Sequence, residues 1–291
     1  MVRRACASGW SLDNAHANAT LPGMDASPVD ERFRGIERLY GAGSVTRLAH
    51  AHVCVVGIGG VGSWAAEALA RSGIGRLTLV DADEVCVGNT NRQLHALDGE
   101  WGKPKVGVIA ERARRIRPGI RLDAIEEFLT PSNLERLLDR GYDVVIDACD
   151  AFRVKVETVA WCRRRKLPLV TVGSAGGRTD PTLVTVRDLS RTEHDALLAL
   201  VRKKLREEFR FPRGPKRYFG VQAVYSRENV RYPQADGSVC GTRPAGGESA
   251  RLDCGNGLGA ATHVTGAFAF AAVSRVLARL LERGKAAAGQ A

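Results

Sequence analysis

A glycine-rich turn between a strand and a helix constrains the fold more than any other feature of the sequence. Residues 52–56 are typical of a buried strand, and residues 61–72 carry apolar side chains at helical spacing. Between these segments, Gly57, Gly59 and Gly62 form a GxGxxG pattern. Glycines let the turn close and let backbone N–H groups at the helix N-terminus approach a phosphate. The turn therefore predicts a nucleotide-binding α/β core.

Strands and helices alternate after this turn. Expected strands cover residues 76–83, 121–128, 142–148 and 167–173, and expected helices cover residues 105–117, 132–140 and 152–166. This order predicts a Rossmann-like, doubly wound, mostly parallel sheet with helices on both faces. Beyond residue 176 we expect a C-terminal α/β extension, with strands at 183–188 and 223–226 and helices at 192–209 and 255–281.

The chain divides into three expected regions. Residues 1–28 are polar and rich in small residues, which favours a flexible leader. Residues 29–284 are expected to form one domain, with a nucleotide core at residues 50–176 and the extension at residues 177–284. Residues 285–291 are expected to form a short tail.

Charge and cysteine content narrow the functional classes. The net charge of +11 arises from 43 Lys and Arg residues against 32 Asp and Glu residues, an excess that attracts polyanions such as nucleic acid. The seven cysteines are scattered and include no CxxC pair, which favours reduced thiols in the cytoplasm and argues against a zinc knuckle.

Polar residues interrupt the stretch after Arg3 and Arg4, so no secretory signal is expected. The apolar stretch 255–281 contains Arg275 and Arg279, so we expect a buried or interface helix rather than a membrane span.

A carboxylate follows the second expected strand. Asp81 stands 24 positions after Gly57, where its side chain can accept hydrogen bonds from ribose hydroxyls. Together with the glycine turn, Asp81 indicates a nucleotide but does not distinguish NAD from ATP.

Charged residues beyond Asp81 favour ATP. A triphosphate carries about four negative charges, so a site that cleaves it needs added cations and usually Mg²⁺ held by a carboxylate. Arg92 and Lys105 can supply the cations, and Asp150, at the end of the fourth expected strand, can help to hold the metal. Asp83 is expected to support the turn rather than to bind metal. The remaining candidates in the segment DADEVCVGNTNRQ are Asn89 and Gln93.

These segments resemble the ubiquitin-activating-like (E1-like) adenylating family, which includes the molybdopterin and thiamine sulfur-carrier adenylyltransferases. The resemblance rests on GIGGVGSW, DADEVCVGNTNRQ, GKPKV and DACD. It implies a homodimer with an ATP–Mg²⁺ site in which Asp81 holds the ribose and Asp150 orients the metal. The implied phosphate and triphosphate contacts are Gly59, Gly60, Asn89, Arg92 and Lys105.

The tRNA-modifying branch of this family matches more of the chain. The sulfur-carrier branch typically has two CxxC pairs for structural zinc, which this sequence lacks. Further similarity runs through GVGSWAAEALARSGIG, NTNRQLHAL, CRRRKLPLVTVGSAGG, YPQADGSVC and LDCGNGLGAATHVTG. It implies that ATP activates the threonyl carboxylate of threonylcarbamoyladenosine, next to the anticodon of a tRNA. A nitrogen of the same group then closes a ring with loss of AMP, which is a net dehydration.

A basic segment offers a surface for the RNA. Eight Lys or Arg residues occur between residues 202 and 217, interleaved with aromatic residues that suit base stacking. A solvated helix face paired to Glu207 and Glu208 explains the same charges equally well. The basic run 163–166 is explained mainly by the dipole of a helix C-terminus. The candidates for contact with nucleic acid are Arg202, Lys203, Lys204, Arg213, Lys216 and Arg217.

No covalent cysteine is required, because the nucleophile is tethered to the activated carboxylate. Cys240 and Cys254 lie in glycine-rich loops where a thiolate could be exposed, and packing in the loop is the alternative. Two other functions stay open: a sulfur-carrier adenylyltransferase and an NAD-dependent oxidoreductase. Neither DNA nor a membrane is an expected partner, and the sequence leaves open whether a sulfur-relay protein docks.

Overall fold

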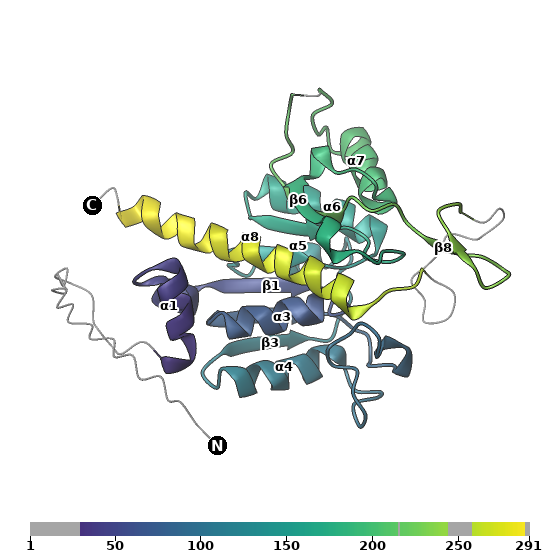
Figure 1. The fold of residues 1–291 in the computed structure, drawn as a ribbon. Helices are drawn as coiled ribbons and strands as arrows, with labels where there is room; N and C mark the ends of the chain where they lie inside the picture. The colour runs from purple at the N-terminus through teal and green to yellow at the C-terminus, as the bar shows by residue number, and fades with distance from the viewer. Residues whose placement is uncertain (1–29, 215, 244–257, 289–291) are drawn as a thin grey trace, which may run out of the picture.

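A seven-stranded sheet forms the centre of the molecule (Figure 1). The computed structural model describes residues 30–214, 216–243 and 258–288, so the expected leader lies outside the described residues. The strand order is β3-β2-β1-β4-β5-β7-β6, and neighbours are parallel except β6 and β7. The strands are β1 (His52–Val56), β2 (Arg76–Val80), β3 (Arg121–Ile125), β4 (Val144–Asp147), β5 (Leu169–Val172), β6 (Val184–Asp188) and β7 (Gln222–Ser226). The expected mostly parallel, doubly wound sheet is confirmed.

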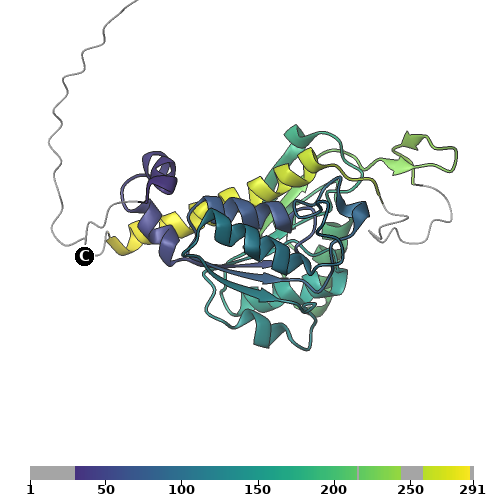
Figure 2. The ribbon, with the colours of Figure 1, turned by 90° about the horizontal axis from the view of Figure 1, so that it is seen from below.

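Helices cover both faces of the sheet, as Figure 2 shows. One face carries α2 (Ser44–His50), α3 (Gly62–Arg71), α4 (Lys105–Ile116) and α8 (Thr262–Ala288). The other face carries α5 (Leu134–Leu138), α6 (Phe152–Arg164) and α7 (Ala196–Glu208). A 3₁₀ turn, η1 (Glu31–Phe33), and α1 (Arg34–Tyr40) precede α2, and further 3₁₀ turns are η2 (Val87–Asn89), η3 (Pro181–Leu183) and η4 (Leu189–Arg191).

The order of the strands creates a crevice at the carboxyl end of β1. The chain runs outward from β1 through β2 to β3, and then returns to place β4 on the other side of β1. In register, Val56 at the end of β1 pairs with Val80 of β2 and with Asp147 of β4. The loops after β1 and β4 therefore leave the sheet toward opposite faces, and ligands of doubly wound sheets bind at such a point.

The C-terminal helix α8 belongs to the core. Phe268, Ala272 and Val276 have no exposed surface, and they pack with α3 and the sheet. By length and composition the segment Thr262–Glu282 could cross a membrane, but 61% of its most apolar part is buried within the protein. Burial against the chain's own sheet accounts for the apolar composition of this helix.

Three helix boundaries differ by more than two residues from the sequence-based expectation. The helix expected from residue 192 begins at Ala196, because the Asp195 side chain accepts the Leu198 backbone N–H at 2.8 Å and caps the first turn. The helix expected from residue 255 begins at Thr262, and the preceding described residues, which include Gly259, are not helical. It continues to Ala288, so the first four residues of the expected tail are helical.

A hairpin occupies part of the extension where we expected only a glycine-rich loop. Its strands are β8 (Tyr232–Pro233) and β9 (Val239–Cys240), which pair antiparallel. Gly237 adopts φ +81°, and the Gln234 backbone N–H donates to the Ser238 carbonyl at 2.8 Å. The Gly237 backbone N–H donates to the Gln234 carbonyl at 3.1 Å, so Ala235, Asp236 and Gly237 form a three-residue hairpin loop that ends in a left-handed glycine.

Candidate active site

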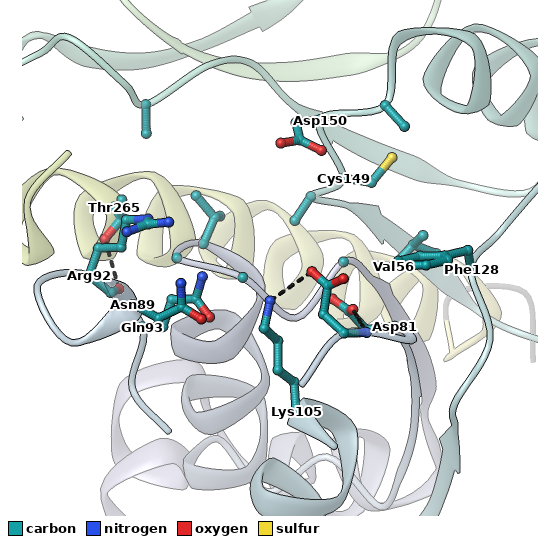
Figure 3. Close-up of a pocket in the computed structure, with 18 of the residues that line it drawn as sticks. Val56, Asp81, Asn89, Arg92, Gln93, Lys105, Phe128, Cys149, Asp150 and Thr265 are labelled. Carbon is teal, nitrogen blue, oxygen red and sulfur yellow. Dashed lines mark hydrogen bonds and ion pairs between the residues drawn. The ribbon is translucent and has the colours of Figure 1, made fainter. Parts of the chain in front are cut away.

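A cavity of about 900 Å³ opens at the carboxyl ends of β1, β2, β4 and β5 (Figure 3). The glycine turn and the loop after β2 form one side, and the loop after β4 forms the opposite side. Ten of the eleven nucleotide-site residues expected from the sequence line this cavity: Gly57, Gly59, Gly60, Asp81, Asp83, Asn89, Arg92, Gln93, Lys105 and Asp150. The remaining one, Gly62, starts α3.

Two of the glycines have no room for a side chain. Gly57 adopts φ +84°, and a Cβ atom there would lie 2.8 Å from the Cys149 backbone nitrogen. At Gly62 a Cβ atom would lie 1.7 Å from the Gly57 carbonyl oxygen. The motif is therefore needed for close approach of backbone to backbone, and it brings the loop after β4 against the turn. Gly59 and Gly60 lie between them and face the cavity.

Asp81 holds the glycine turn in place. Its two carboxylate oxygens accept the backbone N–H groups of Ile58, at 2.5 Å, and Asp83, at 2.8 Å. Only 8% of its surface is exposed, and burial raises the pKa of this carboxyl group despite these two bonds. Asp81 thus supports the turn in addition to any contact it makes with a ribose.

Lys105 is fixed to the same loop by an ion pair. Its Nζ atom lies 2.8 Å from Oδ2 of Asp83, and its backbone N–H donates to the Asp83 carbonyl at 3.0 Å. Lys105 is buried, whereas the Asp83 side chain is half exposed. The ion pair holds a cation at the wall of the cavity, and the predicted support of the turn by Asp83 stays a prediction.

The loop from η2 to Gln93 presents Arg92. An Nη1 donor of Arg92 bonds to the carbonyl of Gly88 at 2.9 Å and to Oδ1 of Asn91 at 3.0 Å. Asn89 is buried, and its Oδ1 atom accepts the Cys86 backbone N–H at 3.2 Å. These bonds fold the loop onto itself and hold Arg92 at the edge of the cavity.

Helices α3 and α8 fasten this loop from outside. The Arg92 carbonyl accepts the indole N–H of Trp64 at 3.1 Å and the hydroxyl of Thr265 at 3.3 Å. The Asn91 amide donates to the Ala260 carbonyl at 2.8 Å, and the Thr262 hydroxyl donates to the Asn91 carbonyl at 2.7 Å. The start of α8 therefore belongs to the support of the site.

Gln93, at the end of this loop, contacts the buried side chain of His95. Its Oε1 atom lies 2.9 Å from Nε2 of His95. Burial, followed by the charge of Lys105, lowers the pKa of His95 to about 4, so the ring is neutral at neutral pH.

Asp150 faces the cavity from the loop after β4, opposite Lys105 and Arg92 (Figure 3). Its side chain does not cap α6, whose N-cap residue is Ala151 and has no side-chain cap. Asp150 therefore does not serve as the cap of the helix that follows it. Among the described residues, no group of three or more His, Cys, Asp or Glu side chains could enclose a metal ion.

A buried ion pair supports the Asp150 loop. Lys155 and Asp147 have no exposed surface, and their Nζ and Oδ2 atoms lie 2.7 Å apart. Burial alone would lower the pKa of Lys155, but the neighbouring Asp147 carboxylate raises it. Cys149 donates its thiol to Asp147 Oδ1 at 3.0 Å, and burial raises the pKa of this thiol, so Cys149 is held as an unreactive thiol.

Sequence reasoning missed several residues of the cavity wall. Thr265 comes from α8 and lies in the stretch LDCGNGLGAATHVTG that carries the resemblance, but no residue pattern there marks it as part of the nucleotide site. The segment 173–176 follows β5 and lies at the carboxyl edge of a parallel sheet, a position that could have identified it. The other missed residues include Phe128, Leu129 and Thr130.

The remaining candidates lie away from this cavity. The Arg202 guanidinium is partly buried and donates to Thr192, and Lys203 and Lys204 pair with Glu207 and Glu208. Arg213, Lys216 and Arg217 are exposed in the loop after α7. Cys240 is exposed in β9, and Cys254 lies outside the described residues.

The fold and the cavity define a doubly wound nucleotide-binding protein with cations and carboxylates gathered around the glycine turn. The ThiF family model matches residues 34–289, and the chain belongs to the ThiF family. It is 49% identical over 253 residues to the tRNA threonylcarbamoyladenosine dehydratase of Escherichia coli strain K12, covering 87% of this chain and 94% of that protein.

Solved structures of the Escherichia coli dehydratase share this fold. The structure in complex with ATP has a TM-score of 0.78 and 44% sequence identity, covering 89% of this chain and 99% of that one. The structure in complex with AMP has a TM-score of 0.77 and 46% identity, covering 87% and 96%.

Proposed function

We propose that this protein uses ATP to dehydrate N6-threonylcarbamoyladenosine in tRNA, next to the anticodon, through adenylation of the threonyl carboxylate. One observation carries the proposal. The glycine turn, Arg92, Lys105 and Asp150 meet in one cavity, in a chain that matches a tRNA threonylcarbamoyladenosine dehydratase over 94% of that protein's length.

Each wall of the cavity has a role in this reaction. Backbone N–H groups at Gly59 and Gly60, at the N-terminus of α3, donate hydrogen bonds to the phosphates, and the Asp81 carboxylate accepts hydrogen bonds from the ribose hydroxyls. Arg92 and Lys105 neutralise charge that develops on the phosphates as the bond to the departing pyrophosphate breaks. Asn89 and Gln93 line the same wall and orient the nucleotide.

Mg²⁺ is the metal that this site suits. Mg²⁺ in nucleotide sites is usually held by one or two carboxylates together with substrate phosphates and water, so a single exposed carboxylate is sufficient. Asp150 supplies that carboxylate from the side of the cavity opposite Lys105. Bound there, the metal would neutralise phosphate charge, and Asp150 would set its position.

Ring closure requires little further machinery. Once the carboxylate is activated, its leaving group is AMP and the attacking nitrogen belongs to the same side chain. Correct positioning of a tethered nucleophile can replace a high concentration of an external one. This supports a site without a covalent cysteine, and Cys149, hydrogen-bonded to Asp147, is not available as one.

The proposal extends to assembly and location. Phe270 on α8 is 52% exposed and meets Trp64 edge to face at 6.4 Å, which supports a homodimer contact on this side. The described cysteines are free thiols, which supports a cytoplasmic location. If a sulfur-relay protein docks, the exposed Cys240 in the β8–β9 hairpin offers it a thiol.

AMP release in the presence of different RNAs tests the function. We expect turnover of ATP to AMP that depends on tRNA bearing threonylcarbamoyladenosine. Equal turnover with unmodified tRNA, or with none, would contradict the proposal. Pyrophosphate exchange driven by a small protein ending in Gly-Gly would favour a sulfur-carrier adenylyltransferase, and tight NADH binding without ATP binding would favour an oxidoreductase.

A further inference from the structure

A second cavity lies at the far end of α6 from the nucleotide site. It has a volume of about 300 Å³ and is formed by the last turns of α6 and the segment that follows α7. Its lining consists of Ala160, Arg163, Arg164, Phe209, Arg210, Phe211, Pro212, Tyr218 and Phe219. These described lining residues include three arginines and four aromatic rings but no acidic residue.

Aromatic packing gives this cavity a fixed floor. Phe219 is buried and meets Phe211 edge to face at 4.9 Å, while Arg206 lies over the Phe219 ring at 5.4 Å. The Arg163 Nε–H donates to the Phe219 carbonyl at 2.8 Å and joins α6 to this segment. The site is therefore held by contacts between distant parts of the chain.

The rim, in contrast, is exposed and cationic. Tyr218 is 62% exposed, with the Arg191 guanidinium over its ring at 5.0 Å. Arg164 and Arg210 are exposed, and Arg210 adopts the left-handed backbone conformation, with φ +57°. That conformation is costly for a residue with a side chain, and here it turns the chain after α7 so that Arg210 lines the cavity.

We infer that this cavity binds a nucleotide unit of the RNA substrate, with an unpaired base stacked on Tyr218 and its phosphate bound by Arg164 and Arg210. The inference rests on the proposed function. Guanidinium groups bind phosphate with paired N–H donors, and aromatic rings accept any base by stacking. The Arg191 guanidinium covers one face of the Tyr218 ring, and an acidic peptide would pair with the arginines but would leave the other face without a stacked base.

The position of the cavity suits a second contact on the same RNA. Val154, in the first turn of α6, lines the nucleotide cavity, whereas Arg163, in the last turn, lines the second one. Nine residues of helix separate them, which corresponds to about 14 Å along the axis. The RNA thus contacts the protein at the reacting nucleoside and again one helix length away.

Binding of tRNA to the full-length protein tests the inference. We expect Tyr218→Ala and Arg164→Ala each to raise the Kd for tRNA by about tenfold, since stacking and phosphate contacts have effects of this size. The Arg164 change should also lower the slope of log affinity against log salt by about 0.7, the value for one phosphate contact on a single strand. The KM for ATP should be unchanged.

Matched variants separate this role from general effects. Tyr218→Phe retains the ring and should bind tRNA like the unaltered protein. Arg115→Ala removes one exposed positive charge from α4, on the other face of the sheet, and should also leave the Kd unchanged. An unchanged Kd in Tyr218→Ala and Arg164→Ala, or an equal loss in Arg115→Ala, would overturn the inference.

Two further results would assign the cavity to another ligand and overturn the inference. One is a second AMP-binding site that Tyr218→Ala removes, which would make the cavity a site for free nucleotide. The other is loss of poly-glutamate binding in Tyr218→Ala or Arg164→Ala without loss of tRNA binding, which would indicate that the cavity binds an acidic protein.

If the unaltered protein releases AMP with modified tRNA but the variants bind tRNA normally, this inference alone fails. If no AMP is released, the proposed function fails.

Discussion

Lys105 and Asp83 are joined twice, by an ion pair of 2.8 Å between their side chains and by a backbone hydrogen bond of 3.0 Å. The side chain of Lys105 is 7% exposed, so the pair fixes a nearly buried cation at the cavity wall. A triphosphate entering the cavity meets this cation already in place.

Removing the Asp83 charge tests whether the ion pair positions Lys105. We expect Asp83→Asn to lower the rate of AMP release by about threefold to tenfold, because the cation is then less well held. Lys105→Ala removes the cation itself and should have the larger effect. Asp98→Asn, at an exposed position in the following loop, is the control and should keep the full rate. Equal rates in Asp83→Asn and the unaltered protein would show that the pair does not position Lys105.

The bond from Trp64 to the Arg92 carbonyl tests the support of the loop. Trp64→Phe keeps an aromatic ring against α8 but removes the indole N–H that donates at 3.1 Å. One hydrogen bond contributes about 1 kcal/mol, so we expect ATP to bind about fivefold more weakly. Titration of ATP into Trp64→Phe and into the unaltered protein measures the two affinities. The free energy of unfolding of each protein shows whether the substitution has destabilised the whole fold. An unaltered ATP affinity would mean that the Arg92 loop is held without this bond.

The buried pair of Lys155 and Asp147 gives a prediction about stability. Lys155→Met leaves the Asp147 carboxylate buried without its cation, and we expect a loss of about 3 to 5 kcal/mol in the free energy of unfolding. The double variant Lys155→Met, Asp147→Leu removes both charges and should recover part of that loss. Urea denaturation of the two variants gives both values. A double variant less stable than Lys155→Met would contradict this account.

His95 predicts a dependence of stability on pH. Its pKa in the folded protein is lowered to about 4 from the ordinary value of 6.5, chiefly by burial. Between these values the unfolded chain binds the proton and the folded protein does not, so stability falls as the pH drops from 6.5 toward 4. We expect a loss of about 1 to 2 kcal/mol in the free energy of unfolding from this residue by pH 5. That pH lies about 1.5 units below the pKa of histidine in the unfolded chain, and each unit corresponds to about 1.4 kcal/mol.

Denaturation with urea at neutral pH and at pH 5 measures this loss. His95→Asn should reduce the difference between the two conditions, whereas His50→Asn, at an exposed position, should leave it unchanged. The same pH dependence in His95→Asn and in the unaltered protein would exclude His95 as its source.

Short-range sequence patterns predicted the nucleotide-binding core, because apolar runs and glycine spacing determine where strands, turns and helices form. The apolar run of β1 and the glycine spacing define a strand, a turn and a helix, and the structure places each of them within one or two residues. The carboxyl ends of parallel strands share one edge, so Asp81 and Asp150 could be placed in one cavity before the structure was known.

Contacts between distant segments carried no such pattern. Nothing near Thr265 indicates that its hydroxyl reaches the Arg92 carbonyl, since that contact exists only after α8 crosses the face of the sheet. The second cavity likewise joins α6 to a segment about 50 residues later, and Arg163 alone resembled an ordinary basic helix end. The sequence predicted cations there, and tertiary packing made them a site.

The most direct test of the central claim is AMP release by Arg92→Ala and by Asp150→Ala with tRNA bearing threonylcarbamoyladenosine. Charge stabilisation at a transferring phosphoryl group contributes about 2 to 4 kcal/mol, so we predict that each variant loses at least about tenfold in rate. Arg115→Ala should retain the full rate. Full activity in both Arg92→Ala and Asp150→Ala would contradict the assignment of this cavity as the place where ATP is cleaved.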